Sequence, residues 1–90
     1  MMTSERSTFV AEMVAWINQR LAPPGVTITA DTPLFAGGLI NSIRVLELIA
    51  WTERAIGAEI PDQRIRMDNF RTVRRIAEVF VAEGGSDVAA

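Results

Sequence analysis

The chain contains no cysteine, no histidine and no lysine. Without cysteine it can form neither a disulfide nor a catalytic thiolate. Without histidine as well, it lacks the usual ligands of a zinc site and the base of a histidine triad. The absence of lysine excludes a P-loop lysine and a Schiff base. Because the carboxylates show no paired spacing either, we expect a protein that is not an enzyme and holds no metal ion.

The composition is that of one small domain. The chain has 90 residues, 49% of them hydrophobic, and a formal charge of −2. This charge does not favour nucleic acid as a partner, and no apolar run approaches the roughly 20 residues of a membrane span. The first residues lack the apolar stretch of a secretory signal. We expect a single domain over residues 1–90, ordered at about 5–83 with a short tail at 84–90, in a soluble, cytoplasmic monomer.

Apolar spacing predicts the first helix, of about 15 residues, which Ser4 or Ser7 caps and which Pro23 and Pro24 stop. Its predicted core positions are Phe9, Val10, Met13, Val14, Ile17 and Leu21. A long connection, residues 26–41, follows without a second strand pattern to pair with it. We expect an extended loop whose apolar residues tuck onto the helices; these are Val26, Ile28, Leu34 and Phe35.

The second helix is predicted from about Ser42 to Ile56, with Gly57 just after its end. At about 100° per residue, one stripe of this helix forms the core face; it contains Val45, Leu48, Ile49, Thr52 and Ile56. Apolar residues also lie outside this stripe, namely Ile43, Leu46, Ala50 and Trp51. Trp51 either covers the edge of the core or lies at a partner interface.

A short, weak helix is predicted near residues 68–70, and a last helix from Val73 to about Glu83, capped by Thr72. The fold class is therefore all-α, a four-helix bundle with three main helices, a short third helix and a long first loop.

Ser42 allows two interpretations. A serine at a helix start is commonly an N-cap. However, Ile43 and Leu46 form an apolar patch beside it, as at a docking surface around an attachment point. Free N–H groups and the helix dipole would also favour a phosphate there. Gly37 and Gly38 before it either form a turn or leave room for a partner to reach Ser42.

Residues 31–83 resemble the acyl carrier protein family, in particular its stand-alone and peptidyl carrier members. The matching stretches are Asp31-Thr32-Pro33-Leu34-Phe35, Gly38-Leu39-Ile40-Asn41-Ser42-Ile43, Leu46-Glu47-Leu48, Ile56-Gly57-Ala58-Glu59-Ile60-Pro61-Asp62, and Asp68-Asn69-Phe70 followed by Thr72-Val73. Each stretch alone is weak evidence, but the ordered set at family-like spacing is strong. The short tails at both ends favour a stand-alone protein.

The resemblance implies a function. Ser42 would carry a 4′-phosphopantetheine arm, added from coenzyme A by a phosphopantetheinyl transferase. The thiol of the arm would hold an acyl or aminoacyl group as a thioester for an activating ligase and downstream biosynthetic enzymes. The residues that would face these partners are Asn41, Ile43, Leu46, Glu47 and Ala50.

Two departures from the family pattern stand out. Asn41 replaces the usual aspartate before the serine, so the charge that helps the transferase is missing. The second helix balances Arg44 and Arg54 against Glu47 and Glu53, whereas that helix is strongly acidic in fatty-acid carriers. We infer a carrier of a specialised pathway, loaded by its own ligase with an amino acid or a small acyl group.

Two other function classes fit parts of the sequence. The same fold and patch would serve an unmodified protein-interaction module. A small helical DNA-binding domain would use the basic stretch of Arg64, Arg66, Arg71, Arg74 and Arg75. The acidic residues interleaved with that stretch and the acidic chain as a whole speak against DNA binding.

Overall fold

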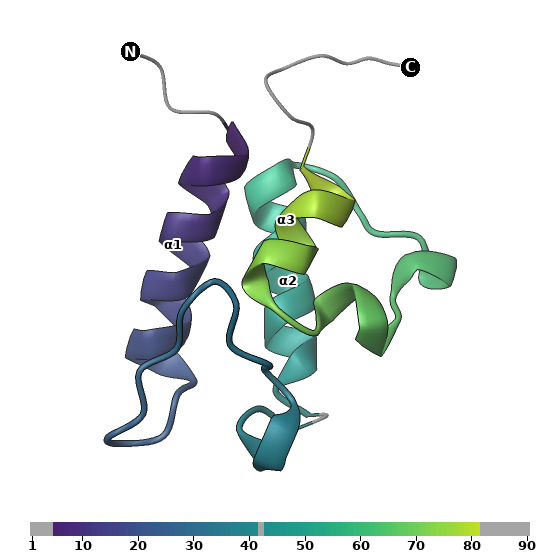
Figure 1. Ribbon diagram of the computed structural model, residues 1–90. Helices are drawn as coiled ribbons and strands as arrows, with labels where there is room; N and C mark the ends of the chain where they lie inside the picture. Colours follow the sequence, from purple (N-terminus) through teal and green to yellow (C-terminus); the bar gives the residue numbers. More distant parts are fainter. Residues whose placement is uncertain (1–4, 42, 82–90) are drawn as a thin grey trace.

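The computed structural model describes residues 5–41 and 43–81, so Ser4, Ser42 and the predicted tail lie outside the described residues. Within this part the chain is all-helical (Figure 1), with α1 at Glu5–Arg20, α2 at Val45–Ile56 and α3 at Val73–Phe80. Three short 3₁₀ turns complete it: η1 at Ala36–Gly38, η2 at Asp62–Arg64 and η3 at Met67–Phe70. The all-α fold class predicted from the sequence, with three main helices and a long first loop, is confirmed.

Helix α1 forms along the apolar spacing found in the sequence. Phe9, Met13 and Ile17 are buried on its inner face, and Leu21 is buried just beyond its end. Val10 and Val14 are half-buried against the same core. The helix begins at Glu5 and therefore contains Ser7, so Ser7 is not its cap as one alternative predicted.

Hydrogen bonds to α1 and to α3 hold the connection between α1 and α2 in place. The Asn18 side chain accepts the backbone N–H of Ile28 at 2.8 Å and donates to the Ile28 carbonyl at 3.1 Å. On the α3 side, the backbone N–H of Arg74 donates to the Ala30 carbonyl at 2.9 Å. This loop is therefore pinned between α1 and α3, which fixes the path of the chain toward α2.

Apolar side chains anchor the same connection, although one prediction about them is wrong. Ile28 and Leu34 are fully buried and Phe35 is half-buried, as predicted. Val26 is 40% exposed and does not tuck onto the core. It follows Gly25, whose φ of 83° turns the chain outward at the end of the proline-rich bend.

Helix α2 begins at Val45, three residues later than predicted, and ends at Ile56 as predicted. Residues 43–44 form a turn in front of it. Gly57 has the left-handed conformation of a helix terminus, with φ 72°. The N–H groups of Gly57 and Ala58 both donate to the Glu53 carbonyl, which is the bond pattern of a glycine-terminated helix end.

The segment between α2 and α3 contains the weak helix predicted near residues 68–70, as the single turn η3. A second turn, η2, directly follows Pro61. Thr72 caps α3 as predicted, because its hydroxyl accepts the N–H of Arg75 at 3.0 Å. The predicted end at Glu83 is wrong: α3 stops at Phe80, since Val81 is extended and directs its side chain into the core.

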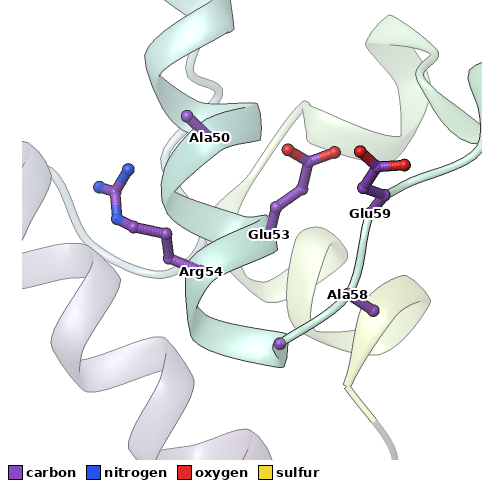
Figure 2. A pocket seen from close by; sticks show the side chains of 6 residues that line it. Ala50, Glu53, Arg54, Ala58 and Glu59 are labelled. Carbon is purple, nitrogen blue, oxygen red and sulfur yellow. The ribbon is translucent and has the colours of Figure 1, made fainter.

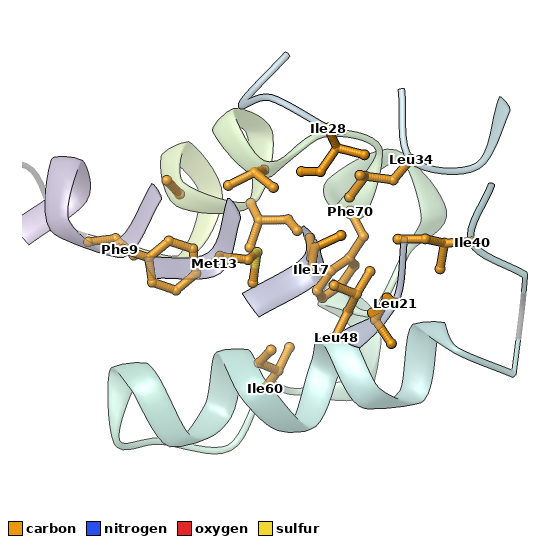
Figure 3. Close-up of a cluster of buried hydrophobic side chains, with 14 residues drawn as sticks. Phe9, Met13, Ile17, Leu21, Ile28, Leu34, Ile40, Leu48, Ile60 and Phe70 are labelled. Carbon is orange, nitrogen blue, oxygen red and sulfur yellow. The ribbon is translucent and has the colours of Figure 1, made fainter. Parts of the chain in front are cut away.

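The three helices and the long loop enclose one apolar core (Figure 3). Met13, Ile17, Leu34, Leu48 and Ile76 have no exposed surface. Trp51 lies at the edge of this core, stacked on Trp16 with ring centroids 5.7 Å apart and edge-on to Phe9 at 5.4 Å. It therefore links α2 to α1 and covers the core, the first of the two roles considered for it.

No helix in the described residues is long and apolar enough to cross a membrane.

Candidate functional site

The turn that leads into α2 is held by Asn41. Its side-chain oxygen accepts the backbone N–H of Arg44 at 2.9 Å, and its carbonyl accepts the N–H of Val45. Arg44 occupies the position directly before the helix and has no side-chain cap bond, so Asn41 supports the helix start from the preceding turn. The capping role predicted for Ser42 falls on a residue outside the described ones. The N–H groups of Arg44 and Val45 are already bonded within the chain, so the helix start offers fewer free donors for a phosphate than the sequence indicated.

The residues on both sides of Ser42 are open to solvent. Asn41 is exposed, and the side chain of Ile43 is 74% exposed. Leu46, one turn further on, is 65% exposed, while Leu48 on the opposite face is fully buried. Ile43, in the turn before α2, and Leu46 and the exposed Ala50 on α2 therefore form an apolar surface separate from the core face. We call this surface the docking face, because the sequence predicts that partners bind there.

The charges near this docking face neutralise one another. Arg44 contacts Glu47 at 3.3 Å, and both side chains are about half exposed. Further along α2, the Glu53 carboxylate accepts the backbone N–H of Ile60 at 2.9 Å. The helix surface next to Ser42 therefore presents apolar side chains with little net charge.

Gly37 and Gly38 are explained by backbone geometry. Their φ angles are 64° and 73°, in the left-handed region that residues with a Cβ resist. A Cβ at either position would meet no other atom within 4 Å. The turn interpretation therefore accounts for both glycines, and the chain itself needs no clearance there.

The basic stretch of the sequence is largely used in folding. Arg71 and Arg75 contact Asp68, and the Arg64 guanidinium donates to the Val79 carbonyl while lying over the Phe80 ring. Arg74 forms a two-bond ion pair with Asp31, at 2.7 and 3.0 Å. Hydrogen bonding from Arg74 lowers the pKa of Asp31, and Asp31 in turn raises the pKa of Arg74. These arginines do not form the free basic face that DNA binding would need.

One feature near the site was not found from the sequence. Beyond Ala50, a shallow hollow is lined by Glu53, Arg54, Gly57, Ala58 and Glu59 together with Ala50 itself (Figure 2). Gly57 indicated the end of the helix, but nothing in the pattern indicated that the chain after it would wall a depression. A metal site is a separate question. Across residues 5–41 and 43–81, no group of three or more histidine, cysteine or carboxylate side chains is placed to hold a metal ion.

The family model described as "Phosphopantetheine attachment site" matches residues 19–80, more than half of the chain. The chain belongs to this family of phosphopantetheine-bearing carrier proteins. It is therefore a carrier and not an enzyme, and its prosthetic group is covalently attached 4′-phosphopantetheine. Its partners include a phosphopantetheinyl transferase and biosynthetic enzymes. No curated protein matches the chain.

The surroundings of Ser42 fit this prosthetic group. A long arm needs an attachment point whose neighbours are open to solvent, and Asn41 and Ile43 both are. The phosphodiester of the arm is anionic, and no carboxylate occurs in residues 36–46. The first carboxylate after Ser42, on Glu47, is paired with Arg44. Among the described residues, neither the exposed neighbours of Ser42 nor an unpaired carboxylate close to it in the sequence opposes an anionic arm there.

Proposed function

We propose that Ser42 is the attachment point of the phosphopantetheine arm. The observation that carries this proposal is the exposure of Asn41 and Ile43 on both sides of it, at the head of a solvent-facing apolar stripe. The matched segment, residues 19–80, contains no other serine. Among its threonines, Thr52 is fully buried and Thr72 is occupied as the cap of α3.

Mass measurement tests this assignment directly. The purified chain is incubated with coenzyme A, magnesium and a broad-specificity phosphopantetheinyl transferase, and its intact mass is recorded beside that of Ser42→Ala. The wild type gains one phosphopantetheine and the variant gains none. A gain in the variant would move the site to another hydroxyl. No gain in the wild type with several transferases would contradict modification of this chain by such enzymes.

We further propose that the docking face receives the enzymes that act on the arm. When bound, the arm supplies a thiol that carries an acyl or aminoacyl group as a thioester. Ile43, Leu46 and Ala50 offer apolar contact beside it, and Asn41 and Glu47 lie at the border of this surface. Leu46→Ala removes the larger part of an exposed side chain without opening the core. Because the variant loses apolar contact with the transferase, it is loaded more slowly. Because the core stays closed, its melting temperature is nearly unchanged.

The charge balance of α2 supports a specialised pathway with a dedicated ligase that loads an amino acid or a small acyl group. An enzyme with a basic docking patch needs unpaired carboxylates, whereas Arg44 and Glu47 pair with each other here. A fatty-acid-type acyltransferase with such a patch should therefore use the loaded wild type poorly. It should use the Arg44→Glu/Arg54→Glu variant better. Equal use of both proteins would contradict this proposal. We also propose a monomer located in the cytoplasm, which sedimentation and cell fractionation test.

A further inference from the structure

The hollow next to Ala50 lies on the same face of α2 as the apolar patch. On a helix of 3.6 residues per turn, Leu46, Ala50 and Gly57 fall within about 40° of one another. The rise of about 1.5 Å per residue places Ala50 about 6 Å and Gly57 about 16 Å beyond Leu46. A standard protein interface covers about 800 Å² on each partner, a disc of about 16 Å radius. An enzyme centred near Leu46 therefore covers Ala50 and reaches the hollow.

The floor of the hollow is small and apolar. Ala50, Gly57 and Ala58 bring no side chain larger than a methyl group, and the whole open hollow has a volume of about 430 Å³. Figure 2 shows Glu53 and Glu59 on one side of this floor and Arg54 on the other. Ile43 and Leu46 protrude at the near end of the docking face, whereas the far end recedes.

The walls of the hollow are fixed by hydrogen bonds. The left-handed Gly57 and the bonds of Gly57 and Ala58 to the Glu53 carbonyl set the direction of the chain after α2. The Glu53 carboxylate then holds the N–H of Ile60, whose side chain is buried in the core. The hollow is therefore present before a partner arrives, which reduces the entropy cost of filling it.

From these observations we infer that the hollow receives one uncharged, apolar side chain of the phosphopantetheinyl transferase. Its apolar floor does not suit a charged group. The charged groups, Arg54 and the carboxylates of Glu53 and Glu59, stand at the two sides of this floor. This inference rests on the proposed function, and it adds the connection at Gly57–Glu59 to the docking face. A buried apolar anchor of this kind usually contributes a large share of the affinity of an interface.

Filling the hollow from within tests the inference. In Ala50→Leu the new side chain occupies the space, and leucine keeps the helix nearly as well as alanine does. Ala58→Leu fills it from the chain that follows α2. The matched control is Ala55→Leu, the same exchange at an exposed position of α2 that faces away from the hollow. The kcat/KM of loading by the transferase is measured for each, and thermal melting confirms that each is folded.

We expect Ala50→Leu and Ala58→Leu to lower kcat/KM about tenfold, which corresponds to about 1.4 kcal/mol, and Ala55→Leu to leave it within about twofold. If the filled variants are loaded as fast as Ala55→Leu, or faster, the hollow does not take a partner side chain. The wild type separates this failure from that of the proposed function. Loading of the wild type at Ser42 upholds the carrier assignment whatever the filled variants do, and no loading overturns the assignment itself.

Discussion

Asn18 offers the sharpest test of how this fold is held together. It lies on α1, and its side chain forms two hydrogen bonds with the backbone of Ile28, one as acceptor and one as donor. Ile28 is 1% exposed but both bonds are only partly buried, so water replaces a lost partner in part and the net worth of each bond applies. Asn18→Ala removes both bonds and leaves an N–H and a carbonyl without their partner.

The cost follows from these two bonds. Each contributes about 1 kcal/mol net, which gives about 2 kcal/mol for the pair. Alanine is a better helix former than asparagine by about 0.6 kcal/mol, which offsets part of the loss. The expected decrease in the free energy of unfolding is thus about 1.4 kcal/mol. In a domain of this size, that lowers the melting temperature by about 6–11 °C.

The assay is thermal unfolding followed by circular dichroism, and the control is Gln19→Ala. Gln19 is the next residue of α1 and is exposed, so its replacement should change stability by less than about 0.5 kcal/mol. If Asn18→Ala melts together with Gln19→Ala, the Asn18 bonds do not stabilise the loop and the reasoning is refuted. Amide hydrogen exchange at Ile28 gives an independent reading, since exchange there should accelerate in Asn18→Ala alone.

Three further predictions concern the site and its surroundings. Asn41→Ala removes the acceptor that holds the turn before α2 and should cost about 1 kcal/mol, whereas Asn41→Asp keeps the acceptor; equal melting of the two variants would contradict this role. Leu48→Ala should cost about 3 kcal/mol because Leu48 is fully buried, whereas Leu46→Ala, on the exposed face, should change stability by less than about 0.5 kcal/mol. The lowered pKa of Asp31 means that its ion pair with Arg74 stabilises the fold above pH 3.8 and is lost as the pH falls below that value. The difference in melting temperature between wild type and Asp31→Asn should therefore shrink in acid, and a constant difference down to low pH would contradict the pairing.

The sequence allowed the helices to be predicted wherever one apolar period ran unbroken. The buried stripes of α1 and α2 both lie on the predicted faces, and Gly57 and Thr72 mark a helix end and a helix start as expected. These signals are local, because a cap or a periodic stripe depends on residues within one or two turns. The exposure of Leu46 was predictable for the same reason.

What the sequence did not reveal depends on contacts between distant segments. The pinning of the loop by Asn18 joins residues 10 positions apart, and the ion pair of Arg74 with Asp31 joins residues 43 positions apart. No periodicity predicts such pairs. The early end of α3 has a similar cause, since Val81 leaves the helix in order to enter the core. The hollow was missed because it lies between a helix and the chain that turns back beside it.

At the start of α2, hydrogen bonding to the backbone and negative charge are separated, although one aspartate could supply both. An aspartate before the serine would both accept such a hydrogen bond and supply a negative charge to partners. Asn41 keeps the hydrogen bond to the Arg44 N–H through its side-chain oxygen and gives up the charge. Arg44 then contacts Glu47, and the carboxylate of Glu53 is engaged by a backbone N–H, so these three charges are bonded within the chain. We therefore expect recognition to depend on shape, on two protruding apolar side chains and one hollow. On this proposal, a dedicated partner with a complementary surface is favoured over enzymes that select their carriers by charge.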